Sequence, residues 1–271
     1  MPELPEVETT RRGIEPHAVG RRIVELAVHE PRLRWPVEKS MSALVAGQRI
    51  LHAKRRAKYL LLELESGTLL LHLGMSGSLR VLPADTPRLT HDHVDLVLDS
   101  GSTLRFNDPR RFGSLHYTTD DPNEHPLLAD LAPEPLDAAF STDYLWQTTR
   151  GRRVTIKQLL MNSKLVVGVG NIYASEALFR AKVRPRRQAR SLSRAEVARL
   201  ARAVRTVLTM AIRVGGTTLR DYVGADGIPG YFSQKLFVYE RAKQPCRKCG
   251  TLVRQLTQGQ RSTYYCPTCQ K

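Results

Sequence analysis

The chain has 271 residues, enough for one large domain or two to three small ones. Charged residues make up 25% and hydrophobic residues 41% of it, which excludes a disordered or collagen-like chain. The longest apolar run is far shorter than the roughly 20 residues of a membrane span. The acidic start MPELPEVE is unlike a signal peptide, so we expect neither membrane insertion nor Sec-type secretion.

The net charge of +16 is unevenly distributed along the chain. Residues 1–135 hold 17 Lys+Arg and 19 Asp+Glu, a net of −2, whereas residues 136–271 hold 25 and 7, a net of +18. A half this basic indicates a polyanionic partner, with nucleic acid first. The alternative, a merely soluble basic surface, would spread its charge more evenly.

The first half reads as one helix followed by strands. Pro5, Glu6 and Glu8 suit the first turn of a helix, where acids face the positive end of the dipole. Arg11 and Arg12 suit its negative end. Loose alternation over 23–29 predicts a strand. Two hairpins are predicted by apolar runs around short connectors, 59–65 with 68–73 and 94–98 with 103–106, and together they favour a β-sandwich.

Helices are predicted after a linker rich in proline and acid, residues 119–138. Ser193 and Glu196 form a capping box before a long helix that ends at Gly215. Two shorter helices, 155–162 and 171–181, precede it and are joined by the turn VVGVG. Asn171 is expected to cap the second of them. A helix start behind glycines can bind an anion, here a DNA phosphate, although the signal alone is weak.

All four cysteines lie in the last 26 residues, as two C-x-x-C pairs separated by 16 residues: Cys246, Cys249, Cys266 and Cys269. This is the spacing of a four-thiolate zinc ribbon. Disulfides need an oxidising compartment, and a redox dithiol needs one C-x-x-C near a βαβ unit. We therefore predict one Zn²⁺, structural because four protein ligands leave no open position.

The N-terminus has a chemical use of its own. Removal of Met1 would expose Pro2 as a secondary amine, and an α-amino group with a pKa near 8 is partly neutral and nucleophilic at pH 7. Such an amine could attack a sugar C1′ and form a Schiff base, with Glu3 as proton donor or acceptor. The alternative is an ordinary start in which the proline has no role.

The order of motifs along the chain resembles that of the formamidopyrimidine-DNA glycosylase family of bacterial base-excision repair enzymes. The motifs are PELPEVE, RRAKY, HLGMSG, HDHVD, NDPRRFG, VGVGNIYASE and the terminal zinc finger. The resemblance implies an α+β fold: an N-terminal β-sandwich with flanking helices, a helix-two-turn-helix domain and a β-hairpin zinc finger. The corresponding boundaries are 1–133, 134–236 and 237–271.

The resemblance also implies roles for individual residues. Lys58 and Arg261 would act beside Pro2 and Glu3 by contacting the phosphate at the lesion, with Arg261 assisting the second elimination. The alternatives are a solvated strand edge for Lys58, since alternation puts it on one face with Lys54 and Arg56, and a surface turn for Arg261.

Further residues match the family's DNA contacts. Three would fill the gap left by the extruded base, as opposed to packing in the core: Met75, Arg110 and Phe112. Those expected to contact DNA are His72, His91, Arg110, Arg152, Asn171 and Tyr239. The glycine-rich stretch 215–232 would be a mobile loop over the oxidised purine, and Asn162 stands where family members often have aspartate.

The resemblance implies a bifunctional DNA glycosylase with AP lyase activity on oxidised purines, cutting the strand by β- and δ-elimination. Damaged double-stranded DNA would be the partner of a monomer in the bacterial cytoplasm, with no nucleotide cofactor and no membrane. Two alternatives stay open. One is an endonuclease VIII-like enzyme for oxidised pyrimidines, and the other is a non-catalytic zinc-ribbon DNA-binding protein, which would leave Pro2 and Glu3 without a role.

Overall fold

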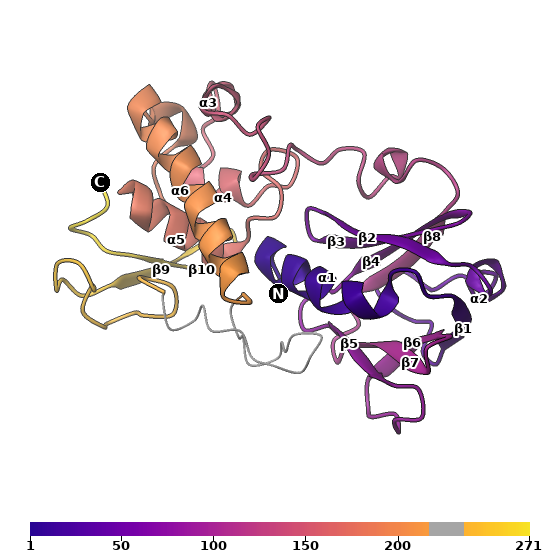
Figure 1. Cartoon of the computed structure of the whole chain (residues 1–271). Helices are drawn as coiled ribbons and strands as arrows, with labels where there is room; N and C mark the ends of the chain where they lie inside the picture. Colours follow the sequence, from indigo (N-terminus) through magenta and orange to yellow (C-terminus); the bar gives the residue numbers. More distant parts are fainter. Residues whose placement is uncertain (217–235) are drawn as a thin grey trace. The chain divides into compact units, whose positions relative to one another are not determined.

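The computed structural model describes residues 1–216 and 236–271, which divide into two units (Figure 1). The first unit holds residues 1–129 and 214–216, and the second holds residues 130–213 and 236–271. The predicted linker 119–138 crosses the boundary between the units at residues 129 and 130, and it contains one short 3-10 turn, Pro122–Glu124, and no α-helix or strand. Across the described ranges, no helix combines the length and the apolar character that a bilayer crossing requires.

Two four-stranded antiparallel sheets form the first unit, in the orders β1-β6-β7-β5 and β2-β3-β4-β8 (Figure 1). The strands are β1 Ile23–Val28, β2 Ile50–Arg56, β3 Tyr59–Leu64, β4 Gly67–His72, β5 Ser78–Pro83, β6 Asp92–Leu98, β7 Ser102–Asn107 and β8 Ser114–Thr118. Both predicted hairpins are confirmed, as β3–β4 and β6–β7. Their leucines share one core, in which Leu62 and Leu69 of one sheet join Leu96 and Leu104 of the other.

Helix α1, Leu4–Ala18, packs against strands of both sheets, and the short α2, Met41–Val45, lies near β1. The expectation that Arg11 and Arg12 mark the end of α1 is wrong. The helix continues to Ala18 because Ile14 and Ala18 extend its buried face into the sandwich core. Arg11 and Arg12 instead pair with Glu8, at 3.1 and 2.8 Å.

The described residues of the second unit form four α-helices, one short 3-10 helix and a β-hairpin. They are α3 Thr142–Thr149, α4 Ile156–Leu160, α5 Asn171–Ala181, the 3-10 helix Ala189–Ser191, α6 Arg194–Arg213, β9 Arg254–Gln258 and β10 Arg261–Tyr265. Helix α5 packs on α6, α4 and β10, so it links the other helices to the hairpin. The predicted capping box is confirmed. Ser193 N donates to Glu196 Oε2 at 2.8 Å, and Glu196 N donates to Ser193 Oγ at 3.3 Å.

The expectation that Asn171 caps α5 is wrong. Gly170 is the N-cap residue, and Asn171 is already the first helical residue. The side-chain oxygen of Asn171 accepts a hydrogen bond from Lys157 Nζ at 2.6 Å, so it is committed to another element. A cap was predicted from residue preference, which does not register a partner that lies 14 residues away in sequence.

Candidate functional site

The predicted nucleophile lies at the start of α1, where the chain enters the sandwich. Pro2 and Glu3 are buried, and Glu3 N donates to Glu6 Oε2 at 2.9 Å, which fixes the first turn. With Met1 attached, the Pro2 nitrogen belongs to an amide, so a nucleophilic amine exists only after Met1 is removed.

A glycine close to α1 belongs to the segment that was predicted to cap the lesion. Gly216 has φ +78°, and a Cβ there would lie 2.9 Å from Glu6 Oε1. Only glycine fits both the backbone conformation and the close approach. The segment therefore begins next to Glu6, which accepts the hydrogen bond from Glu3 N. The rest of the predicted loop, residues 217–232, lies outside the described residues.

Lys58 is not on a strand, so the expected alternation with Lys54 and Arg56 is wrong. Strand β2 ends at Arg56, and Ala57, with φ +53°, turns the chain so that Lys58 lies in the connection to β3. Lys54 instead pairs with Glu63 at 2.7 Å. A two-residue turn interrupts the twofold period of a strand, which a continuous basic run conceals.

His72, at the end of β4, lies within electrostatic reach of Lys58. Burial, with smaller contributions from Lys58 and Arg34, lowers the pKa of His72 to about 4. Its Nδ1 faces the Gly74 N–H at 3.0 Å and accepts from it, so the neutral ring carries its proton on Nε2. His72 is therefore an uncharged hydrogen-bond donor at neutral pH.

The structure brings two predicted void-filling loops together. Gly74 precedes Met75 in the turn after β4, and a Cβ at Gly74 would overlap the backbone of Phe112 and Gly113. Phe112 is 45% exposed, so it is not part of the core, and Met75 is half-buried. The Arg110 guanidinium lies 5.1 Å from the centre of the Phe112 ring. The side chains of Arg110 and Phe112 therefore lie on one surface of the first unit.

Asp108 organises this surface, and sequence reasoning missed it. Its buried carboxylate accepts hydrogen bonds from Gly113 N at 2.8 Å, from Ser76 Oγ at 3.2 Å and from Arg110 N at 3.3 Å. Its backbone N donates to the carbonyl of His91, whose φ is +73°. The aspartate preceding a proline in NDPRRFG was the signal that could have found it.

In the second unit, a buried lysine connects the helices to the hairpin. Lys157 of α4 is 1% exposed, and its Nζ donates to Asn171 Oδ1, Ser262 O and Thr263 Oγ1 at 2.6, 3.0 and 2.8 Å. Arg261 is exposed at the start of β10, directly after the tight turn, as the sequence predicted. Lys157 was missed because an isolated lysine on a short helix carries no sequence signal of burial.

A buried glutamate holds the segment that leads into the hairpin. Glu176 of α5 accepts from the N–H groups of Phe237, Val238 and Tyr239, at 2.9 to 3.0 Å. Burial raises the pKa of Glu176, and the three N–H groups oppose the rise. The ring of Tyr239 meets Tyr264 edge-on, with centroids 5.2 Å apart.

Arg152, another predicted DNA contact, is exposed after α3, and its Nε donates to Thr148 O.

The four cysteine sulfurs lie within 4.8 Å of one another. The Sγ atoms of Cys246 and Cys269 are 4.0 Å apart, and those of Cys249 and Cys266 are 3.5 Å apart. A tetrahedral zinc ion with Zn–S bonds of about 2.3 Å separates its sulfurs by about 3.8 Å, whereas a disulfide needs about 2.05 Å. The thiols therefore fit one zinc ion and do not form disulfides.

Three family models cover most of the chain: the formamidopyrimidine-DNA glycosylase N-terminal domain over residues 1–115, its H2TH domain over 131–223 and the zinc finger found in FPG and IleRS over 243–271. The formamidopyrimidine-DNA glycosylase of Thioalkalivibrio sulfidiphilus is 59% identical over the full length of both chains. The chain belongs to the formamidopyrimidine-DNA glycosylase family.

Solved structures of the family have the same fold. The protein from Thermus thermophilus matches with a TM-score of 0.90 at 42% identity, covering 99% of this chain and 98% of that one. A mutant of the Lactococcus lactis protein in complex with Fapy-dG-containing DNA matches with a TM-score of 0.94 at 31% identity, over 100% of both chains. The α+β fold and the structural zinc site predicted from the motifs are confirmed.

The predicted DNA-contacting residues of this family member divide between the two units. The first unit carries Pro2, Glu3, Lys58, His72, Met75, His91, Arg110 and Phe112, and the second carries Arg152, Asn171, Tyr239 and Arg261. Within the first unit, Asp108 connects the loops of His91 and Arg110 to the turn that bears Met75. Within the second, Lys157 connects Asn171 to the strand of Arg261.

Proposed function

We propose that this chain is a bifunctional DNA glycosylase with AP lyase activity that removes 8-oxoguanine and formamidopyrimidines from duplex DNA. The observation that carries the proposal is the start of α1, where Pro2 is buried beside a Glu3 whose backbone is fixed by Glu6. A zinc-ribbon DNA-binding protein without catalysis would leave Pro2 and Glu3 without a chemical role. The family relation over the full chain supports the same reaction class.

The reaction begins with the amine that Met1 removal exposes. The Pro2 nitrogen attacks C1′ of the damaged nucleotide, the C1′–N bond to the base breaks, and the base leaves with a proton that Glu3 supplies. The C1′–O4′ bond then breaks, O4′ takes the proton that the Pro2 amine has lost to Glu3, and the opened sugar is held on Pro2 as an iminium, which makes the 2′ hydrogen acidic. Its loss expels the 3′ phosphate, and a second elimination expels the 5′ phosphate before water releases the sugar from Pro2.

The charged and polar side chains would hold the DNA during these steps. Lys58 and Arg261 clamp phosphates at the lesion, and Arg261, always protonated, is better suited to clamping than to releasing a proton. His72 contributes a neutral Nε2–H donor, since its pKa is about 4. His91, Arg152, Asn171 and Tyr239 complete the proposed contacts.

Three side chains would occupy the space that the extruded base leaves. Phe112 is exposed on a loop and can wedge between base pairs. The guanidinium of Arg110 beside it can bond the estranged base, which favours cytosine, and Met75 fills the remaining gap. Both loops are fixed to the sandwich through Asp108, so the wedge is held before DNA binds.

The zinc ion would take no part in the chemistry, because its four positions are all thiolates. Its effect is to fold the hairpin that carries Arg261. We propose that the protein acts as a monomer on chromosomal DNA, in the bacterial cytoplasm, without a nucleotide cofactor.

Borohydride trapping on DNA with a single 8-oxoguanine tests the proposal. Reduction should link the protein to DNA through Pro2, and a chain with one extra residue ahead of Pro2 should form no adduct although it still binds. Trapping at a lysine would contradict the mechanism. Incision of duplexes with the lesion opposite each of the four bases tests the role of Arg110, and faster incision at oxidised pyrimidines would favour the endonuclease VIII-like alternative.

A further inference from the structure

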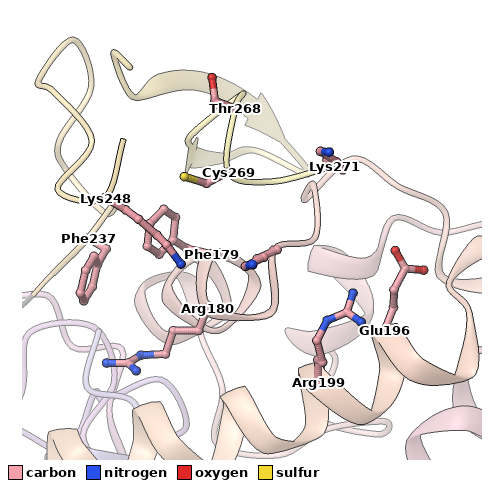
Figure 2. Close-up of a pocket in the computed structure, with 10 residues that line it drawn as sticks. Phe179, Arg180, Glu196, Arg199, Phe237, Lys248, Thr268, Cys269 and Lys271 are labelled. Atoms are coloured by element: carbon pink, nitrogen blue, oxygen red, sulfur yellow. The ribbon is translucent and has the colours of Figure 1, made fainter. Parts of the chain in front are cut away.

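A basic pocket lies in the second unit, between the end of α5, helix α6 and the zinc ribbon (Figure 2). Its volume is about 550 Å³, within the range of ligand sites. Cys269, one of the four thiols of the zinc site, lies in its wall, and the other lining side chains include Phe179, Arg180, Lys182, Arg199, Phe237 and Lys248. Apart from Cys269, none of them was singled out by the motifs, and the proposed reaction uses none of them.

The pocket is separate from the proposed phosphate contact of α5. Asn171 is the first residue of that helix, and Arg180 lies nine residues further on. At a rise of 1.5 Å per residue, about 14 Å of helix separates the two along its axis. A ligand in the pocket would therefore contact the opposite end of α5 from a phosphate at Asn171.

The charge of the pocket exceeds what the helix needs. The negative end of the α5 dipole accounts for Arg180 and Lys182, which lie in or next to its last turn. Arg199 of α6 donates from Nε to the carbonyl of Ala181, the last residue of α5, at 3.4 Å, so the same helix end accounts for it. Lys248 comes from the zinc ribbon and Lys271 from the end of the chain, and that dipole does not explain them. The pocket's acidic side chain, Glu196, is already paired with Arg187.

The floor of the pocket is the half-buried ring of Phe237, backed by Phe179, which is 5% exposed and belongs to the small core of the zinc ribbon. Phe179 and Phe237 stack with centroids 5.2 Å apart and an interplanar angle of 22°, and the Arg180 guanidinium lies 5.6 Å from the Phe237 ring. Figure 2 shows these rings beside Lys248. Away from the lesion, duplex DNA presents phosphates and keeps its bases stacked, so it offers no apolar group to the Phe237 ring. The floor and the cations together fit a ligand that is both anionic and apolar.

We propose that this pocket binds an acidic peptide segment of a partner protein. An apolar or aromatic side chain of the peptide packs on Phe237, and its carboxylates pair with Arg180, Arg199 and Lys248. Arginine and aromatic residues in a concave site are the usual anchors of protein recognition, and guanidinium groups bind carboxylates through two hydrogen bonds. The protein could then bind DNA and the partner at the same time.

Fluorescence anisotropy with the zinc-loaded full chain tests the proposal. The probe is a short labelled peptide of alternating aspartate and serine with one phenylalanine. Arg199→Glu should weaken its binding by about tenfold or more, as expected for a central anchor. Arg202→Glu is the matched control, because Arg202 is exposed on the same helix, carries the same charge and does not line the pocket. Arg199→Gln serves if the reversed charge prevents folding.

The same measurements separate the outcomes. Replacing the phenylalanine of the peptide by alanine should weaken binding, and incision of 8-oxoguanine DNA by Arg199→Glu should be unchanged. Equal binding of the peptide to wild type and Arg199→Glu would overturn the proposal. The proposal would also be overturned if Arg199→Glu lost affinity for undamaged duplex in parallel and that duplex displaced the peptide. The pocket would then belong to the DNA surface.

Discussion

The two units position their proposed DNA contacts by different means. In the first, a sandwich with a large leucine-rich core supports loops that are fixed by a carboxylate, Asp108, accepting from both of them. In the second, the hairpin with Arg261 has a small core of its own and depends on Lys157, Glu176 and four thiols. Both units therefore use buried polar anchors, but the loops of the first unit stand on a large apolar core, whereas the small hairpin of the second unit also needs a metal.

Removal of a zinc ligand should have the largest effect and should be confined to the second unit. We expect Cys249→Ser to unfold the hairpin and abolish DNA binding, because metal binding supplies much of its folding free energy. The sandwich strands should keep their protection in hydrogen exchange. Lys248→Ser, in the same turn but not a ligand, is the control and should retain zinc. Full DNA affinity of a zinc-free Cys249→Ser protein would contradict the assignment.

Loss of the buried lysine should have the next largest effect. Lys157→Met removes the donor to Asn171, Ser262 and Thr263, and we expect a loss of about 3 kcal/mol in unfolding free energy because buried acceptors lose a charged partner. Denaturant unfolding measures it. Exposed Lys164, which pairs with Asp130, offers the control Lys164→Met, with a change below about 1 kcal/mol. Equal losses in both variants would show that Lys157 does not join hairpin to helices.

The corresponding change in the first unit is Asp108→Ala. It removes the acceptor of Gly113 N, Arg110 N and Ser76 Oγ, and we expect a cost of about 2 kcal/mol. The large sandwich should stay folded, so the excision rate should fall strongly while the temperature of thermal unfolding falls only by the amount that this cost implies. Asp108→Asn keeps one acceptor oxygen and should be intermediate. If Asp108→Ala excised at the wild-type rate, the loops would not depend on this carboxylate.

The comparison also shows which features a sequence can reveal. The cysteine spacing and the two hairpins were predictable because local pattern determines them. The motifs identified the family, and through it the proposed contacts. Lys157 and Asp108 were not predictable, since their importance arises from partners brought close only by tertiary packing. Lys58 and Asn171 were misplaced for a related reason: a turn and a distant hydrogen bond override local preference.

The smallest expected effects are in the salt dependence of DNA binding. They distinguish three side chains of the first unit: charged Lys58, neutral His72 and the wedge Phe112. Each phosphate neutralised by lysine contributes about 0.9 to the slope of log K against log salt, so Lys58→Ala should flatten that slope by about one unit. His72→Gln should leave the slope unchanged at pH 7. The pKa of His72 is about 4, so its ring becomes charged only as the pH falls toward that value.

Phe112→Ala should also leave the salt slope unchanged, because it removes no charge. Its defect should be slow excision from an intact duplex, since unstacking a base costs on the order of a few kcal/mol that the wedge offsets. The defect should shrink on a pre-formed abasic site, where less has to be extruded. Binding across a salt series and excision on both substrates test the three variants together. A flattened slope in Phe112→Ala, or equal impairment on the abasic site, would exclude the wedge and leave the exposed ring of Phe112 without an assigned role.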